Sequence, residues 1–381
     1  DETTFDSSIK YITIKGTPDV TRMTSFVNIL KDQTATGAVL DISQLSSDEI
    51  RNNLIANTEL VNKAKAKGWI FRQYSWDGME NFNTFEIETN DTNGLTLTLA
   101  QYINSNGTAE TLERTDWGDG AIDKELSHTY DKPGTYIVKT KLQPNNINTW
   151  DPSDITGGNY NKLNYNKLIK KVINVRNDID NFVSFCGGCT DMEQFNIDNT
   201  IHPTDMTYMF DRCSSLTSID VTKFNTTNTI SLYWLFNECT SLNTIIGLED
   251  LKVENVKDIT YAFAETSIVN ADLSKWNFKE LTSIYGLFYN CYKLQSVDLT
   301  GWDISKVNNL YALFYGCYEL TSIKGIENWD TSNVASMGGT FTELRALKTL
   351  DLSEWDVSNV KVMYAMFEGC SSLEKLGDLS N

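Results

Sequence analysis

The chain has 381 residues, more than one hydrophobic core usually serves, so its length predicts two or three domains. An aromatic content of 11% and a hydrophobic content of 40% indicate a folded chain rather than a disordered one. The formal net charge of −19 would repel a phosphate backbone, which argues against a nucleic-acid partner, and no run of about 18 apolar residues is present to span a membrane.

Residues 1–80 are predicted to form a small α/β unit. Strands are expected at 9–14, 37–42 and 68–71, separated by helices over 20–31 and 47–67. The strand spacing suits βαβ units and also suits degenerate leucine-rich repeats, and we favour a repeat-like unit. The first residues carry no signal-peptide pattern, so the chain is either cytoplasmic or a mature protein whose signal was removed.

Residues 81–172 are predicted to form a β-sandwich, with alternating strands at 85–89, 95–99 and 136–140. Between them stand Asp116-Trp-Gly-Asp-Gly120, His128-Thr-Tyr130 and Pro133-Gly-Thr-Tyr-Ile-Val138. These three ordered motifs resemble the PKD-type immunoglobulin-like sandwich, which implies an all-β spacer. Asp116 and Asp119 invite a calcium or general-acid interpretation, but no third carboxylate stands at ligand spacing, so we expect a turn. His128 is expected to be a strand residue, and 144–166 a long loop.

Residues 173–381 repeat with a period of about 26 residues, which predicts a solenoid of about eight repeats. A Phe is followed three residues later by Cys and six residues later by Leu in most copies. Repeats 1 to 8 are anchored at Cys186, Phe210, Phe236, Phe263, Phe288, Phe314, Phe341 and Phe367. Apolar residues at −7, −4 and −1 from the anchor favour one face of a short helix or helical turn, and a strand follows the Cys position. The fold expected is therefore a leucine-rich-repeat-like α/β solenoid.

Six cysteines hold one repeat position and should form an interior column: Cys189, Cys213, Cys239, Cys291, Cys317 and Cys370. Two repeats place Thr266 and Leu344 there instead, which a metal site or disulfide would not tolerate. We expect buried free thiols, and we expect Cys186 and Cys189 to mark the first repeat rather than a redox or zinc site. No metal site or cofactor is expected.

Copies such as the segment 350–376 closely resemble the BspA-like leucine-rich repeats of bacterial surface proteins, over roughly 180–381. The resemblance implies a secreted or cell-surface protein of adhesin type and names no partner. The chain carries none of the GxSxG, Walker, GxGxxG or HExxH motifs and only two histidines, so we expect no enzyme activity. Acids such as Asp220 and Asp298 recur at one repeat position, which is the pattern that stacked repeats produce and not the asymmetric set of residues that a catalytic site needs.

The ligand-binding candidates are six tyrosines at the −3, +1 and +4 positions of repeats 5 and 6. They are Tyr285, Tyr289, Tyr292, Tyr311, Tyr315 and Tyr318. Because adjacent repeats stack, these rings should form one patch suited to glycan stacking or to a protein contact. The competing interpretation is rim packing or a dimer contact.

The function predicted is therefore recognition of a host extracellular protein or a glycan at a bacterial surface. Two alternatives stay open at this point. One is a structural stalk that self-associates, for which an open C-terminal repeat would supply the contact. The other is a glycan-binding accessory or phage receptor-binding protein.

Overall fold

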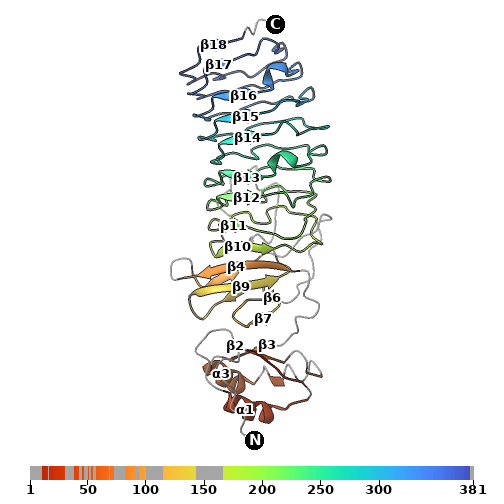
Figure 1. Ribbon diagram of the computed structural model, residues 1–381, viewed down its shortest axis with the longest axis vertical. Helices are drawn as coiled ribbons and strands as arrows, with labels where there is room; N and C mark the ends of the chain where they lie inside the picture. Colours follow the sequence, from red (N-terminus) through yellow and green to blue (C-terminus); the bar gives the residue numbers. More distant parts are fainter. Residues whose placement is uncertain are drawn as a thin grey trace.

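The computed structural model describes residues 11–15, 17–30, 38–42, 45–46, 50, 53–54, 57–67, 69–72, 82–90, 94–99, 115–142 and 166–377. The molecule is elongated, and its C-terminal half is a regular stack of short strands (Figure 1). No helix of these residues is both long and apolar enough to cross a bilayer.

The N-terminal unit is a parallel three-stranded sheet with strands in chain order. Its described elements include β1 (Tyr11–Thr13), α1 (Val20–Ile29), β2 (Ala38–Asp41), α3 (Thr58–Ala66) and β3 (Trp69–Arg72). Asp19 caps α1 by accepting the Arg22 N–H at 2.8 Å, and Asn57 caps α3 by accepting the Leu60 N–H at 2.9 Å. The predicted strands and first helix are present. The expected helix start at 47–49 lies outside the described residues.

The described residues of the central β domain form two sheets. Its strands are β4 (Asn83–Thr89), β5 (Thr96–Thr98), β6 (Thr115–Asp116), β7 (Ile122–Asp123), β8 (Ser127–Thr129), β9 (Gly134–Thr140) and β10 (Ile169–Asn174). β5 pairs with β8, and the other five join one larger sheet. Phe85, Leu97, Trp117 and Val138 are fully buried between the strands. The predicted strands correspond to β4, β5 and β9, whereas the PKD resemblance itself stays a prediction. All of the expected 144–166 loop except its last residue lies outside the described residues.

The β domain and the solenoid share one sheet. β10 pairs antiparallel with β4 and parallel with β11 (Gln194–Phe195), the first short strand of the stack, in the order β11-β10-β4-β9-β6-β7. β10 therefore crosses residues 172 and 173, where the sequence predicted a domain boundary. One continuous hydrophobic core runs from the β domain through the repeats.

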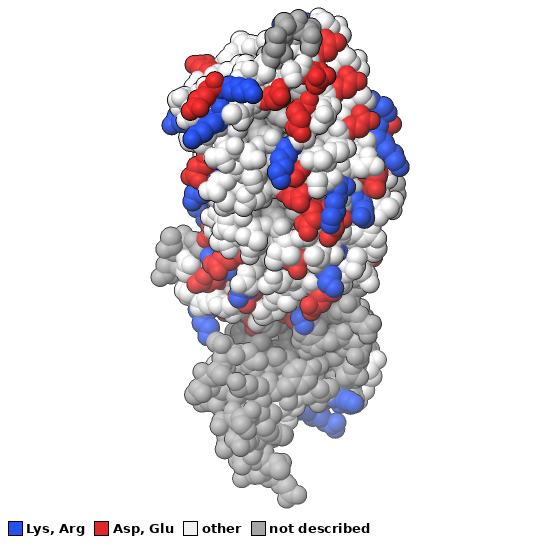
Figure 2. All heavy atoms as spheres, turned by 45° about the horizontal axis from the view of Figure 1, so that its top comes forward, with Lys and Arg blue, Asp and Glu red and all other residues white. Residues whose placement is uncertain are grey.

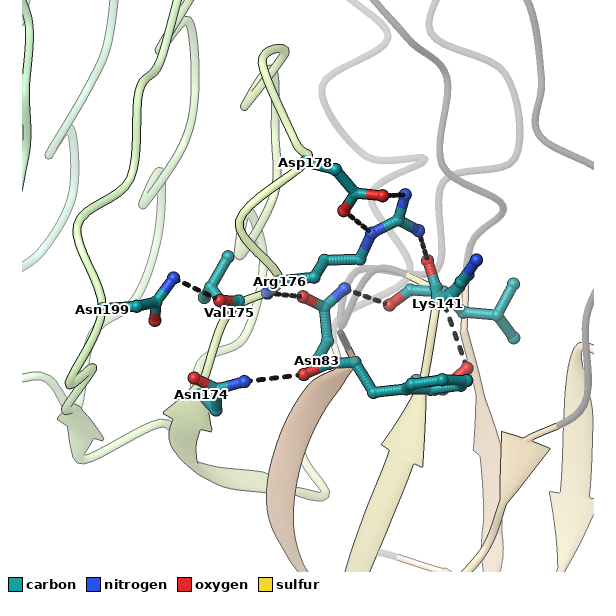
Figure 3. A network of polar contacts seen from close by, with 10 residues as sticks. Asn83, Lys141, Asn174, Val175, Arg176, Asp178 and Asn199 are labelled. Carbon is teal, nitrogen blue, oxygen red and sulfur yellow. Dashed lines mark hydrogen bonds and ion pairs between the residues drawn. The ribbon is translucent and has the colours of Figure 1, made fainter. Parts of the chain in front are cut away.

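A polar network fastens this junction (Figure 3). The buried Asn83 side chain donates to the Leu142 carbonyl at 2.9 Å and accepts the Arg176 N–H at 3.1 Å. The Arg176 guanidinium, whose side chain is fully buried, pairs with both carboxylate oxygens of Asp178 at 2.6 and 3.0 Å. Because buried polar groups left without partners are costly, these contacts hold the two parts in one orientation.

The stack is a β-solenoid of about eight repeats. Its further strands are β12 (Ser218–Asp220), β13 (Thr244–Ile246), β14 (Asn270–Asp272), β15 (Ser296–Asp298), β16 (Ser322–Lys324), β17 (Thr349–Leu350) and β18 (Lys375–Leu376). Parallel pairing joins these strands into three sheets, β12-β13, β14-β15-β16 and β17-β18. Two 3₁₀ turns, η3 (Leu248–Asp250) and η4 (Ile326–Asn328), follow β13 and β16.

Aromatic ladders fill the interior of the stack. Successive anchor phenylalanines from Phe210 to Phe367 stack with ring centroids 5.3–6.2 Å apart. A second ladder consists of Trp276, Trp302, Trp329 and Trp355, at 6.1–6.4 Å. Such ladders require each repeat to cover the apolar layer of its neighbour, which is why a single repeat would not be stable alone.

The expected helices of the repeats are absent from residues 166–377, so the α component of the predicted α/β solenoid is wrong. Each segment before and after the anchor is instead a chain of β-turns. In repeat 6, the Leu313 N–H donates to the Leu310 carbonyl, while the Phe314 N–H donates across to Thr340 of the next repeat. Residues at −2 and +2, here Ala312 and Gly316, have positive φ, which ends any helix. Apolar residues three apart point inward in such a turn chain too, so the pattern imitates a helical face.

Candidate binding surface

The turn chain of repeats 5 and 6 carries the six predicted tyrosines, called here the tyrosine surface. The backbone of repeat 6 shows how the side chains divide. Its inward side chains are fully buried: Leu310, Leu313, Phe314 and Cys317. Its residues at −3, +1 and +4 are the partly exposed Tyr311, Tyr315 and Tyr318. The alternation of backbone hydrogen bonds within and between repeats therefore aims these three positions outward.

The six rings meet in three pairs, one for each repeat position. Tyr285 and Tyr311 pack edge to face with centroids 5.2 Å apart. Tyr289 and Tyr315 stack at 5.1 Å, with 18° between their planes. The third pair, Tyr292 and Tyr318, lies at 5.0 Å, and Tyr292 is the most open of the six at 44% exposure. The rings therefore hold one another in place, which lowers the entropy cost of ordering them against a ligand.

Two further tyrosines extend this surface and were missed in the sequence. Tyr261, at the −2 position of repeat 4, contacts Tyr285 at 4.8 Å and Tyr289 at 5.6 Å. Tyr364, at the −3 position of repeat 8, reaches across repeat 7 and shares a hydrogen bond with the Tyr311 hydroxyl. The signal that could have found them is the pair of small residues beneath the rings. A Cβ at Gly286 would lie 2.4 Å from the Tyr261 ring, and one at Gly338 would lie 2.9 Å from the Tyr311 ring.

The phenol hydroxyls of Tyr261, Tyr289 and Tyr311 stay protonated at neutral pH. Burial raises the pKa of Tyr261 and of Tyr289, and adjacent tyrosines raise both further. The hydrogen bond with Tyr364 raises the pKa of Tyr311 to about 12. The surface therefore offers neutral hydroxyl groups as hydrogen-bond donors and acceptors beside apolar ring atoms, the mixture found at protein and glycan contacts.

The predicted cysteine column lies inside the solenoid. The thiols of Cys239, Cys291, Cys317 and Cys370 each donate to the carbonyl of the anchor Phe in the preceding repeat, at 2.9–3.1 Å. Cys213 donates to the Cys186 carbonyl at 3.3 Å, and Cys189 is also buried and unoxidised. Burial raises the pKa of Cys189, Cys213 and Cys317. The thiolate form, which metal binding and nucleophilic attack require, is therefore disfavoured at these three cysteines.

The Asp116–Gly120 segment forms a tight turn against β9. Asp116 and Asp119 accept the backbone N–H groups of Gly118 and Ala121, both at 2.9 Å. His128 contacts the second Asp119 oxygen at 2.8 Å and stacks on Trp117 at 5.2 Å. Partial burial opposes ionisation of Asp119, but these hydrogen bonds outweigh it and lower its pKa. Among the described residues no group of three or more His, Cys, Asp or Glu side chains is arranged to hold a metal ion.

The repeated acids after the strands serve the backbone. Asp220, Asp272, Asp298 and Asp351 each accept the N–H of the residue two positions on, at 2.8–3.2 Å. A hydrogen bond from Thr300 contributes most to lowering the pKa of Asp298, and one from Ser353 does so for Asp351. These carboxylates cap turns in every case, and none is distinguished as a reacting group.

The repeats are similar to a family of known proteins over part of the chain. Residues 204–320 and 282–381 match the family described as "Mycoplasma protein of unknown function, DUF285", which covers somewhat less than half of the chain. This match and the repeat pattern support a BspA-like repeat protein. No curated protein matches the sequence.

Among solved structures, a leucine-rich repeat protein from Bacteroides ovatus ATCC 8483 is similar, with 17% identity and a TM-score of 0.29. The alignment covers 54% of this chain and 60% of that one, so it spans less than two thirds of that protein. At this TM-score the solved structure carries no argument, and the fold rests on the repeat geometry described above.

Proposed function

We propose that this chain is an extracellular bacterial recognition protein that binds a host protein or a glycan through the tyrosine surface. The observation that carries the proposal is the set of six partly exposed tyrosines held by mutual contact on two adjacent repeats. Tyrosine combines a large rigid contact area with a hydroxyl group and is enriched where proteins bind one another. Location at the cell surface is proposed from the BspA-like repeats alone.

Binding is favoured over catalysis because the cysteine and aspartate side chains that recur in the repeats already form structural hydrogen bonds. The cysteine thiols donate to backbone carbonyls, and the repeated aspartates accept backbone N–H groups. A catalytic site needs one asymmetric constellation, whereas these columns repeat along the stack.

The β domain is proposed to act as a PKD-like spacer that presents the solenoid. Its sheet continues into the first repeat through β10, and the Asn83 and Arg176 network fixes the junction. A rigid connection of this kind would hold the tyrosine surface at a fixed orientation relative to whatever carries the chain.

The test is a capture screen of the purified chain against extracellular matrix proteins and an oligosaccharide array. Tyr289→Ser/Tyr315→Ser/Tyr318→Ser should abolish capture, while the matched Phe triple variant keeps the rings in place and reports on the hydroxyl groups. Tyr292→Ser, at the most exposed ring, provides a second variant that should fold if the triple variant does not.

Full capture by a folded triple variant, or by Tyr292→Ser if the triple variant unfolds, would overturn the proposed site. No capture from either panel, together with light scattering that rises with protein concentration, would replace the proposal with a self-associating stalk.

A further inference from the structure

The Tyr292–Tyr318 ring pair of the tyrosine surface has a cation, the Arg345 guanidinium, on its C-terminal side. Tyr292, Tyr318 and Arg345 occupy the same +4 position in repeats 5, 6 and 7. The Arg345 guanidinium lies over the Tyr318 ring, 4.1 Å from its centroid, and its Nε donates to Glu343 at 2.6 Å. The chain thus contains one complete cation site in this column, built from a ring face and a carboxylate at the +2 position.

The N-terminal side of the same pair has the ring and the carboxylate but no cation. Repeat 4 carries Glu265 at +2, as repeat 7 carries Glu343, yet its +4 residue is Ser267 instead of an arginine. The Ser267 hydroxyl donates to the Thr240 carbonyl at 2.7 Å, and this side chain is too short to cover Tyr292. Accordingly Tyr292 is 44% exposed, whereas Tyr318, beneath Arg345, is only partly exposed.

Glu265 has no cation of the described residues in direct contact at the equivalent position. No ion pair to it is found within the described residues, whereas Glu343 pairs with Arg345 and Glu238 pairs with Arg212. Partial burial and then the charge of Glu238 raise the pKa of Glu265, and they outweigh a hydrogen bond with Asn290 and the charge of Arg212, which lower it. The Glu265 N–H donates to the Tyr289 carbonyl at 2.7 Å, which places Glu265 beside the turn that carries Tyr292. In line with this placement, the charge of Glu265 is, after burial, the largest contribution to the raised pKa of Tyr292. A cation placed beside them would relieve an unfavourable charge.

We propose that the Tyr292 ring and the Glu265 carboxylate form a binding site for a guanidinium or ammonium group on a protein partner. The inference rests on the proposed function and names the chemistry of its ligand. The site combines the same groups as the contact of Arg345 with Tyr318 and Glu343 at the opposite end of the ring pair, namely a tyrosine at +4 and a glutamate at +2 of the adjacent repeat.

Arginine or lysine of a protein, rather than a neutral glycan, fits this surface. The Tyr289 and Tyr315 rings stack on each other, so the facing sides of these rings are not available to a sugar. The chain carries a net charge of −19, which attracts basic partners over distance. On the face shown in Figure 2, charged side chains of both signs flank a stretch of solenoid surface that carries none.

The decisive variant is Ser267→Arg, because the new arginine would place a guanidinium of the chain itself in the proposed cation site. Its matched control is Thr240→Arg, at the +4 position of repeat 3. That position also follows a +2 glutamate, Glu238, but the next repeat has Ser267 rather than a tyrosine at +4. Both variants add the same charge to the same column, and only Ser267→Arg can fill the site over Tyr292.

The probe is N-acetyl-arginine amide, with the uncharged N-acetyl-citrulline amide as its isosteric control. Binding to the full chain is followed by the ring resonances of isotope-labelled tyrosines, with Tyr292 assigned through Tyr292→Phe. The arginine probe should shift the Tyr292 resonance in a saturable manner. Glu265→Gln should weaken binding by about tenfold, Ser267→Arg should abolish it, and Thr240→Arg should leave it unchanged.

An unshifted Tyr292 resonance, an equal response to citrulline, or full binding by Ser267→Arg would overturn the cation site. These outcomes can be distinguished from those of the capture screen for the tyrosine surface. A partner captured equally by the wild type and Ser267→Arg, or a neutral oligosaccharide captured in its place, would sustain the tyrosine surface and refute the cation site. Arginine binding at Tyr292 with no captured partner would sustain the site and refute the wider function.

Discussion

Replacing Gly286 with alanine should push the Tyr261 ring out of its contact with the tyrosine surface. A Cβ at this position would lie 2.4 Å from Cε1 and 2.7 Å from Cδ1 of Tyr261. The backbone itself would accept the change, because Ala312 and Ala365 occupy the same −2 position with φ near the 60° of Gly286. The clash with the ring, rather than the positive φ, therefore explains the glycine.

Two terms set the expected cost of Gly286→Ala. An alanine in left-handed conformation costs about 1 kcal/mol relative to glycine. Overpacking against a ring held by Tyr285 and Tyr289 adds roughly 1–3 kcal/mol, since the ring cannot move without losing those contacts. Loss of about 2–4 kcal/mol in the free energy of unfolding is expected in the wild-type background.

A double-mutant cycle with Tyr261→Ala separates these terms. Without the ring, Gly286→Ala should cost only about 1 kcal/mol, so the coupling energy should be roughly 1–3 kcal/mol. The measurement is urea-induced unfolding followed by circular dichroism for the wild type, both single variants and the double variant. An equal cost of Gly286→Ala in both backgrounds would refute the clash as the reason for the glycine.

Three further perturbations test the stack and its junction. Phe314→Ala should lower the free energy of unfolding by about 3–5 kcal/mol, and Phe367→Ala should lower it by less because the Phe367 ring is only half-buried. Urea titration of both variants measures the two losses, and equal losses would contradict the role of ring burial in the phenylalanine ladder. Burial raises the pKa of Asp211 to about 7 from 3.8, so the folded state retains the proton and stability should fall as pH rises through this window. Asp211→Asn should remove that slope in urea midpoints measured across this window, and an unchanged slope would exclude Asp211 as its source. Asn83→Leu would leave two buried backbone groups without partners, at about 1–3 kcal/mol each, and calorimetry should then show the β domain melting before the solenoid rather than with it.

The candidate site was predictable where it follows from repeat position. The −3, +1 and +4 columns could be read from the sequence, and stacking of adjacent repeats brings residues of one column together. Tyr261 and Tyr364 belong to other positions or to a repeat further along, and they join through space left by Gly286 and Gly338. No periodicity encodes such contacts, because they depend on how far a particular ring can reach.

The sequence by itself determined the number of repeats, the columns of Phe, Cys and Leu that face inward, and the parallel N-terminal strands. These features depend on short spacings, and burial of the equivalent residues in most repeats enforces them. Only the tertiary structure decided between helix and β-turn chain before each anchor, since both place residues three apart on one side. The deciding factor is the hydrogen bonds that alternate N–H groups donate to the next repeat. The dual pairing of β10 likewise follows from partners distant in the chain, and so the shared sheet could not be anticipated from local pattern.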